Sequence, residues 1–219
     1  MTSDFSCVLW DLDGTIVDSA PGIIASLAYT YQQLGLEVPP YEEMLAWVGP
    51  PIMDSFRDLA HLDAEESARA LAIYREHYIT HGARHSPIFP GMPAVLRAVH
   101  EAGMPTSLAT SKPEVPATLI LESAGLTPYI DIITGASADE VRSAKKDVVA
   151  EALLRLTARG VDITRPVLVG DRRHDVEGAA ANGVPTILVE WGYGSEEEKA
   201  GTIASAETPD DLLRLLLGR

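Results

Sequence analysis

The chain has 219 residues, a formal net charge of −15 and 46% hydrophobic residues. That apolar content is enough for a real core and is too high for a disordered protein. The acidic balance argues against a nucleic-acid or anionic-membrane partner, because both attract basic surfaces. Cys7 is the one cysteine, so no disulfide can form within the chain. These properties are typical of a soluble enzyme built as one domain, or as one domain with an insertion.

The start of the chain predicts no targeting segment. Residues 1–6 are short and polar and lack the apolar stretch of a signal peptide. The longest apolar runs are well below the length that a membrane span needs. We therefore expect a cytoplasmic protein without a membrane partner, as a monomer or a small homo-oligomer.

The first predicted element is a short apolar strand at residues 7–10, which ends in two carboxylates. Asp11 and Asp13 are one residue apart, so both side chains can point past the strand end in the same general direction. Open α/β sheets place their ligands at the carboxyl ends of strands. The pair therefore indicates one aspartate as a nucleophile, the other as an acid/base, and a hard cation between them.

Residues 19–86 contain helical periodicity and no good strand. One helical stripe holds Ile23, Ile24, Leu27, Tyr31 and Leu34. An insertion placed directly after the carboxylate pair would lie over the site as a lid, and lids exclude water and select substrates. We therefore predict a helical cap at residues 19–86 and an α/β catalytic core made of residues 1–18 and 87–219.

Beyond the insertion, short apolar runs alternate with amphipathic stretches. The runs predict strands at residues 106–109, 130–134, 166–169 and 186–189. The amphipathic stretches predict helices at residues 94–102, 116–124, 147–158 and 176–182, each with a glycine at or just past its end. This alternation favours a doubly wound parallel sheet.

Two of the predicted strands precede residues that suit a phosphate. Thr110 and Ser111 follow the strand at 106–109, and their hydroxyl and backbone N–H groups are suitable partners for phosphate oxygens. Lys145 and Lys146 open the helix after the strand at 130–134. A lysine there could screen the charge between a carboxylate and a phosphate, although each signal alone is weak.

Two further carboxylates follow the strand at residues 166–169. Asp171 stands at the strand end, and Asp175, four residues on, opens a helix. Carboxylate oxygens are the ligands that magnesium prefers, so this pair can complete a magnesium site.

Taken in this order, the motifs resemble those of the haloacid dehalogenase-like hydrolase superfamily, over essentially the whole chain. Residues 109–113 and 191–194 further resemble the phosphoglycolate phosphatase-like and 5′-nucleotidase-like branch. The resemblance implies a Rossmann-like core with a helical cap of the first type. The matching motifs are Asp11-Leu12-Asp13-Gly14-Thr15, then Thr110, then Lys145, and finally Gly170-Asp171 with Asp175.

The resemblance implies a mechanism for phosphate esters. Asp11 attacks phosphorus and forms an aspartyl-phosphate, while Asp13 protonates the leaving alcohol and later deprotonates the attacking water. Mg²⁺ is expected to be held by the carboxylates of Asp11 and Asp171 and by the backbone carbonyl of Asp13. Asp175 is expected to orient a metal-bound water or the phosphate-binding lysine.

Binding of the transferring phosphoryl group falls, by the same resemblance, to Thr110, Ser111 and Lys145. The spacing from the lysine to Val148 and Val149 favours Lys145 over Lys146. This arrangement would offer the positioning and charge stabilisation that phosphoryl transfer requires.

The loop at residues 48–51 lies where members of the superfamily recognise the leaving group. Gly49 and Pro50 are therefore candidate specificity residues, and Arg57 is a candidate for the charge that the loop lacks.

The prediction is a magnesium-dependent phosphomonoesterase acting on a small phosphorylated metabolite. Phosphoglycolate, a 5′-nucleotide and a sugar phosphate all stay open as substrates. One alternative is a β-phosphoglucomutase-like phosphotransferase that passes the group to a sugar hydroxyl, and another is a non-catalytic binding or regulatory protein on the same fold. Dehalogenation is disfavoured, because a halide needs no proton and the second aspartate, Asp13, is present.

Overall fold

The computed structural model describes residues 4–139 and 141–218. Within these residues, five strands form one parallel sheet in the order β2-β1-β3-β4-β5, which confirms the predicted doubly wound α/β fold. Parallel neighbours need crossover connections, and helices supply them. The strands are β1 (Cys7–Trp10), β2 (Thr106–Leu108), β3 (Pro166–Gly170), β4 (Thr186–Val189) and β5 (Ala204–Ala206).

Helices fall into a group before β2 and a group around the sheet. The first group comprises α1 (Ala20–Leu34), α2 (Tyr41–Met44), η1 (Leu45–Trp47), α3 (Ile52–Asp58), α4 (Ala64–Thr80) and η2 (Gly82–His85), called here the inserted helices. The second group comprises α5 (Met92–Glu101), α6 (Glu114–Ser123), η3 (Thr127–Tyr129), α7 (Lys145–Ala158), α8 (Arg173–Ala180), η4 (Glu196–Lys199) and α9 (Pro209–Leu217).

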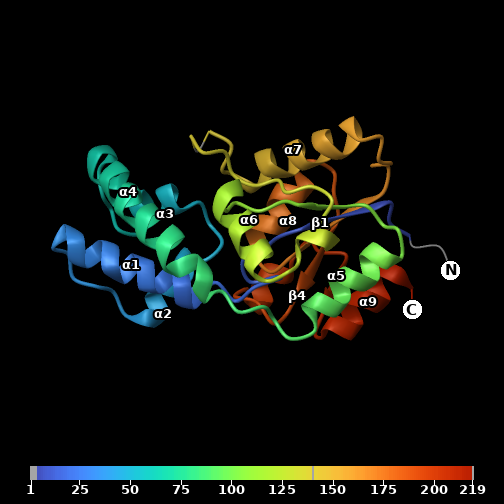
Figure 1. Ribbon diagram of the computed structural model, residues 1–219, viewed down its shortest axis with the longest axis horizontal. Helices are drawn as coiled ribbons and strands as arrows, with labels where there is room; N and C mark the ends of the chain where they lie inside the picture. Colours follow the sequence, from blue (N-terminus) through green and yellow to red (C-terminus); the bar gives the residue numbers. More distant parts are fainter. Residues whose placement is uncertain (1–3, 140, 219) are drawn as a thin grey trace.

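The central strand β1 divides the core into two clusters. Its side chains alternate between the sheet faces, so Val8 and Trp10 pack with α5, α6 and α9, while Cys7 and Leu9 pack with α7 and α8. Figure 1 shows α7 along one side of the sheet and α5 with α9 along the other. Since β1 is buried on both faces, it is apolar throughout, and its carboxyl end opens at the sheet edge where the inserted helices lie.

The inserted helices have a core of their own. α1 packs against both α4 and η2, and its approach to η2 is very close: a Cβ on Gly22 would lie 2.2 Å from the carbonyl oxygen of Gly82, so only glycine fits there. A run of aromatic rings continues from these helices to the loop between them, with centroid separations of 5.1–6.3 Å. Such pairs add stability beyond their buried area. The rings belong to Tyr31, Trp47, Phe56, Tyr74 and Tyr78.

Two connections that lie side by side join the inserted helices to the sheet. Asp18 donates its backbone N–H to the carbonyl of Pro87 at 2.8 Å, next to an antiparallel bridge between Val17 and Ile88. The hydroxyl of Tyr193 donates to the Asp18 carboxylate at 2.7 Å and accepts the N–H of Ala20 at 3.0 Å. The entry and exit of the insertion are therefore tied to each other and to a loop of the sheet domain.

The strand predicted at residues 130–134 is wrong as a regular member of the sheet. This segment runs beside β2, where Leu108 donates to the carbonyl of Ile132 at 2.7 Å, but it makes one isolated bridge, between Ser107 and Ile132. The reason lies at the start of β2, where Thr106 donates its backbone N–H to the Asp131 carboxylate at 2.8 Å. The Asp131 side chain thus accepts the Thr106 N–H, which a backbone carbonyl of a neighbouring strand would otherwise accept.

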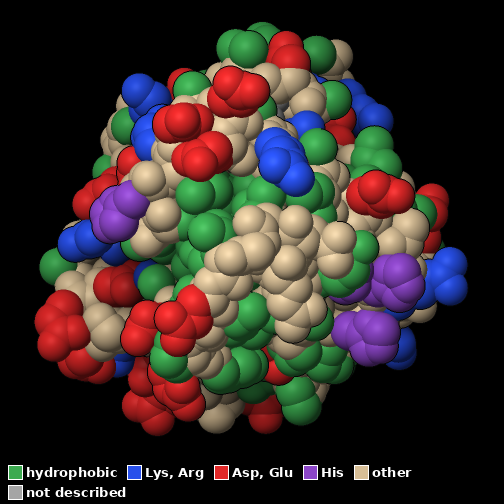
Figure 2. Space-filling model, turned by 90° about the vertical axis from the view of Figure 1, so that its left-hand side faces the viewer, with side chains coloured by type: hydrophobic (Ala, Val, Ile, Leu, Met, Phe, Trp, Pro, Cys, Tyr) green, Lys and Arg blue, Asp and Glu red, His purple; other side chains and the backbone are tan. Residues whose placement is uncertain are grey.

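The face that carries the inserted helices is mixed in character. Figure 2 shows hydrophobic side chains gathered across its middle and acidic side chains scattered around them. Within residues 4–139 and 141–218, none of the helices is both long enough and apolar enough to cross a bilayer.

Candidate active site

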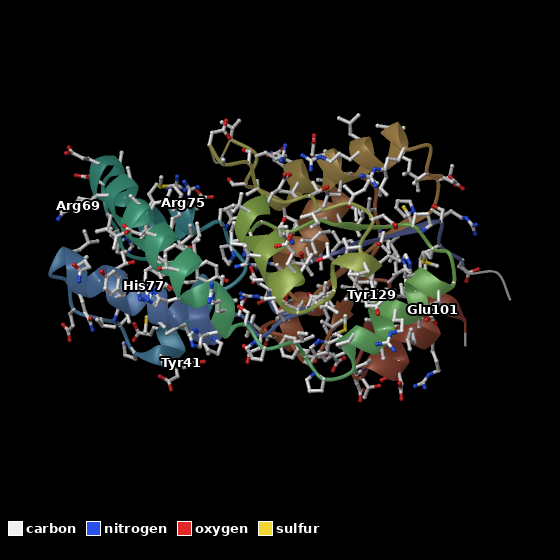
Figure 3. The ribbon with its side chains drawn as sticks, in the orientation of Figure 1. Tyr41, Arg69, Arg75, His77, Glu101 and Tyr129 are labelled. Carbon is white, nitrogen blue, oxygen red and sulfur yellow. The ribbon has the colours of Figure 1, made fainter. Side chains whose placement is uncertain are left out.

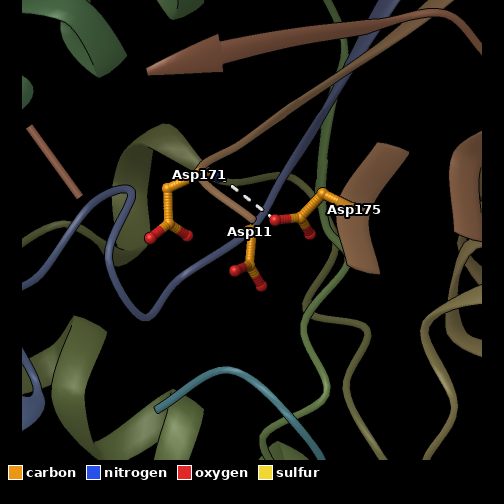
Figure 4. Close-up of side chains that lie close together, drawn as sticks. All are labelled: Asp11, Asp171 and Asp175. Atoms are coloured by element: carbon orange, nitrogen blue, oxygen red, sulfur yellow. Dashed lines mark hydrogen bonds between the residues drawn. The ribbon is translucent and has the colours of Figure 1, made fainter. Parts of the chain in front are cut away.

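Three aspartates meet at the carboxyl end of the sheet. Asp11 follows β1, Asp171 follows β3, and Asp175 lies in the first turn of α8. One carboxylate oxygen from each lies within 4.8 Å of the others, and all three residues are buried (Figure 4). The parallel arrangement of β1 and β3 brings together residues that are 160 positions apart in the chain, since both strands end at the same edge.

Backbone N–H groups hold two of these carboxylates. Asp175 Oδ2 accepts from the N–H of Asp171 at 3.1 Å and from that of Arg172 at 3.0 Å (Figure 4). Asp171 Oδ2 accepts from the N–H of Tyr193 at 2.7 Å. Gly14 has a φ of +83°, and a Cβ there would lie 2.1 Å from the Asp171 carboxylate. Gly14 is therefore required for two reasons: its positive φ favours glycine, and the Asp171 carboxylate occupies the space that a side chain would need.

Lys145 links the cluster. Its Nζ lies 2.6 Å from Asp11 Oδ1 and 2.6 Å from Asp175 Oδ1, and it donates to the carbonyl of Ala109 at 3.1 Å. Burial opposes the charged form, but the two carboxylates more than offset it and raise the pKa of Lys145 above its usual value. Lys146 is exposed instead, so of the two neighbouring lysines Lys145 is the one that reaches the carboxylates.

Burial and mutual repulsion favour the neutral form of the carboxyl groups and so raise their pKa values. Burial raises the pKa of Asp11 to about 7, with Lys145 lowering it and Asp175 raising it. Burial and the charges of Asp175 and Asp11 raise the pKa of Asp171 well above its usual range. Three buried carboxylates with one lysine leave an excess of negative charge. An all-oxygen donor set of this kind fits a hard divalent cation such as Mg²⁺.

Asp13 faces away from this cluster and meets a different lysine. Its Oδ2 lies 3.0 Å from Lys112 Nζ, which also donates to the Tyr78 hydroxyl at 2.9 Å. The Lys112 ammonium lies 4.4 Å from the centre of the Tyr78 ring, so α4 contacts the acid/base candidate through this lysine. Asp13 Oδ1 is buried and has no hydrogen-bond partner among the residues that the structure describes.

The sequence assigned no role to Lys112 or to Tyr193. Lys112 follows Thr110 and Ser111 directly, and both Lys112 and Tyr193 lie in the stretches 109–113 and 191–194 that carry the branch resemblance, which were the signals for them. Thr110 is buried, and its Oγ1 accepts from the N–H of Lys112 at 3.2 Å. Ser111 lines the cavity described next.

A cavity of about 390 Å³ opens beside Asp13, between the inserted helices and the loops that follow β2. Gly49 and Pro50 line it, as does Ser111. Arg57 lies elsewhere: its guanidinium pairs with Asp54 at 3.2 Å and Asp58 at 2.8 Å, with more than half of the arginine side chain exposed. The structure therefore brings Gly49 and Pro50, but not Arg57, to this cavity.

Comparison with known proteins identifies this arrangement. Residues 8–189 match the family described as haloacid dehalogenase-like hydrolase. The chain belongs to that family. The match spans the sheet through β4, the inserted helices and all the carboxylates described above, so the family resemblance inferred from the motifs is confirmed.

Relatives of this haloacid dehalogenase-like hydrolase carry several names. A protein of Mycobacterium tuberculosis named tyrosine-protein kinase PtkA is 38% identical over 213 residues, covering 95% of this chain and 72% of that protein. A Pseudomonas aeruginosa protein named 5′-nucleotidase is 32% identical, covering 87% of this chain and 85% of that protein. A crystal structure titled as a predicted phosphatase from Clostridium acetobutylicum has a TM-score of 0.89 at 33% identity, covering 96% and 97% of the two chains.

Proposed function

We propose that this hydrolase is a magnesium-dependent phosphomonoesterase that acts on a small phosphorylated metabolite through an aspartyl-phosphate. The observation that carries the proposal is the position of Asp11, buried between Lys145 and the other carboxylates, with Asp13 beside a cavity that can hold a leaving group. The relatives named 5′-nucleotidase and phosphatase support a phosphate ester as substrate.

Asp11 acts as the nucleophile. Its carboxylate oxygen attacks phosphorus, the bond from phosphorus to the leaving oxygen breaks, and the phosphoryl group becomes attached to Asp11. Lys145, 2.6 Å from Asp11 Oδ1, orients the attacking carboxylate and lies close enough to neutralise charge on the phosphoryl oxygens. Thr110 and Ser111 supply further donors at the end of β2.

Asp13 acts as the acid and then as the base. It gives a proton to the leaving oxygen in the first step and takes a proton from water in the second, when water attacks phosphorus and releases Asp11. Its unpartnered Oδ1 is free to make these transfers, while Lys112 holds Oδ2. Asp13 is thus restrained at one oxygen and available at the other.

Mg²⁺ fits this donor set. The carboxylates of Asp11 and Asp171 and the backbone carbonyl of Asp13 would hold it, and Asp175 positions Lys145 and the backbone of Asp171 rather than contacting the ion. When bound, the ion neutralises charge on the carboxylates and on the phosphate.

Residues 19–86 serve, in this proposal, as a cap that shields the reaction from water. Arg172 supports this role, because its Nη1 donates to the carbonyl of Val48 at 3.0 Å while its own backbone N–H is held by Asp175. The cap loop next to Gly49 is therefore tied to the same turn that carries Asp171.

The test is release of inorganic phosphate from a panel of small phosphate esters, with Mg²⁺ and with excess chelator. Release that requires Mg²⁺ and disappears in Asp11→Asn supports the proposal. Recovery of a phosphorylated sugar without free phosphate would indicate a phosphotransferase instead. Binding of esters without any turnover would indicate a non-catalytic protein on this fold.

A further inference from the structure

The cavity beside Asp13 is where the leaving group of the substrate must lie. Asp13 lines the inner end of the 390 Å³ space, and in the proposed function it protonates the leaving oxygen. The rest of the leaving group therefore extends from Asp13 into this cavity. The chemistry of the walls then decides which leaving groups are favoured, because a ligand is selected by the groups that it contacts after losing water.

The wall formed by the inserted helices is apolar and rich in aromatic rings. Tyr74 and Tyr78 stack on each other with an interplanar angle of 9° and a centroid separation of 5.5 Å, and both line the cavity. An apolar wall that contains aromatic rings suits an apolar ring better than a short polar chain. The side chains of this wall are Ile23, Trp47, Ile52, Tyr74, Tyr78 and Ile79.

The opposite wall comes from the segment after β2 and mixes apolar and polar side chains. Pro113, Val115 and Pro116 offer no side-chain hydrogen bonds, and the polar lining residues of this segment are Ser111, Lys112 and Glu114. Val115 is 62% exposed, so it lies at the mouth of the cavity rather than in the core. A leaving group in this space therefore meets apolar surface on both walls.

Among the residues that the structure describes, the four charged ones that line the cavity have partners in the protein. Asp13 pairs with Lys112, and the carboxylate of Glu114 lies 2.8 Å from both Arg142 and Arg155. Arg75, which stands on α4 (Figure 3), donates to the carbonyl of Ala138 at 3.4 Å. A carboxylate or a set of hydroxyls buried here would lose its water for few compensating bonds.

We propose that the preferred substrate carries a flat aromatic ring on the alcohol side of the ester, and that leaving groups without such a ring, such as a short acid or a sugar alone, are disfavoured. This inference rests on the proposed phosphatase function. The ring could belong to an aromatic alcohol or to the base of a nucleoside, and both present the same flat, mostly apolar surface to the two walls.

The experiment compares kcat/KM for four esters of primary alcohols, so that the intrinsic reactivity of the leaving groups is similar. The esters are benzyl phosphate, adenosine 5′-monophosphate, phosphoglycolate and glucose 6-phosphate. We expect one or both ring-bearing esters to exceed phosphoglycolate and glucose 6-phosphate by about tenfold or more. The ratio of benzyl phosphate to the nucleotide distinguishes an aromatic alcohol from a nucleoside.

A matched pair of variants tests the cavity wall directly. Val115→Arg adds a cation at the cavity mouth, while Leu154→Arg adds the same charge on α7, at a residue that is 63% exposed and does not line the cavity. Both sites are on exposed helix surfaces, so folding should be retained. We expect Val115→Arg to shift the kcat/KM ratio of benzyl phosphate to phosphoglycolate about tenfold toward phosphoglycolate, with no shift for Leu154→Arg.

Three results would overturn the inference. The first is a kcat/KM for phosphoglycolate or glucose 6-phosphate that equals or exceeds both ring-bearing esters. The second is an equal shift of the ratio in the two arginine variants. The third is no phosphate release from any ester, which would overturn the proposed function as well and is thereby distinguished from a failure of the leaving-group preference alone.

Discussion

The two ends of the candidate site are held in place by different kinds of interaction. At the sheet edge, Asp11, Asp171 and Asp175 are fixed by Lys145 and by backbone N–H groups. In the cavity, the walls are mostly apolar side chains from the inserted helices and from the segment after β2, and packing fixes those on the inserted helices. Charged groups held by hydrogen bonds tolerate little change in geometry or charge, whereas apolar walls tolerate substitutions of similar volume. Chemistry and substrate choice should therefore respond to different mutations.

The largest expected effect is at Asp11, the proposed nucleophile. Asp11→Asn should lower kcat by about 10⁴–10⁶-fold, since an amide cannot form the covalent intermediate. The measurement is phosphate release under saturating Mg²⁺, together with mass spectrometry of the protein for a phosphorylated aspartate. Activity within tenfold of the parent would mean that another residue attacks phosphorus.

The next largest expected effect distinguishes Lys145 from its neighbour Lys146. Lys145→Met should lower kcat/KM by about 10²–10³-fold, because it removes the cation between Asp11 and Asp175. It should also destabilise the fold by about 3–5 kcal/mol, since it leaves buried carboxylates unpaired. The matched control is Lys146→Met at the exposed neighbour, which should leave both activity and urea midpoint nearly unchanged. Similar losses in the two variants would contradict the geometry at the sheet edge.

Much of the sheet-edge arrangement could be predicted because each residue stands where an apolar run stops or a helix begins. Asp11, Thr110 and Asp171 each follow a strand closely, and parallel strands bring such positions to one edge whatever the loops do. The family spacing from the lysine to Val148 and Val149 favoured Lys145 over Lys146. The catalytic roles of these residues stay predictions until the variants are measured.

The cavity was harder to predict because it depends on how separate segments pack. The pairing of Lys112 with Asp13 and Tyr78 requires the path of the loop after β2 and the rotation of α4, and neither is encoded locally. Arg57 sits on α3, a helix of seven residues, whose periodicity is too short to fix which face points inward. Its pairing with Asp54 and Asp58 places it on the exposed face.

Errors within the sheet can be traced to particular hydrogen bonds between segments. Residues 130–134 have strand composition, but the side chain of Asp131 takes the backbone donor of β2. β5 has the sequence Ala-Ser-Ala, which lacks the branched residues that mark a strand, and it forms by pairing with β4 at the sheet edge. Both cases reflect tertiary hydrogen bonding overriding composition.

A metal titration tests whether the buried carboxylates at the sheet edge bind Mg²⁺. Burial raises the pKa of Asp11 from 3.8 to about 7. Between these pH values the folded metal-free chain therefore binds more protons than the unfolded chain. Protonation of Asp11 thus contributes to the stability of the fold, and that contribution is lost as the pH rises through this range. Mg²⁺ bound by these carboxylates would replace those protons. At a hundredfold excess over its Kd it should stabilise the fold by about 2.7 kcal/mol, or about 5–10 °C in Tm.

The Tm shift on adding Mg²⁺ should therefore be larger at pH 8 than at pH 6, as measured by differential scanning calorimetry. Asp171→Asn should abolish most of the shift, and sodium chloride at equal ionic strength serves as the control. A shift that is equal at the two pH values, or that survives Asp171→Asn, would argue against these carboxylates as the metal ligands.

The smallest effect lies where the two ends of the site meet. Tyr78→Phe keeps the ring that packs on Lys112 and removes the hydroxyl that accepts its hydrogen bond. Lys112 should then hold Asp13 less firmly, so kcat should fall by about tenfold for every ester, with the ranking of the esters unchanged. Tyr31→Phe is the matched control, because Tyr31 is buried in the same aromatic run but does not line the cavity. Tyr78→Phe could instead change the ranking of the esters and leave kcat for the best ester intact. Tyr78 would then act on the leaving group directly. The separation between chemistry and substrate choice would not hold at this contact.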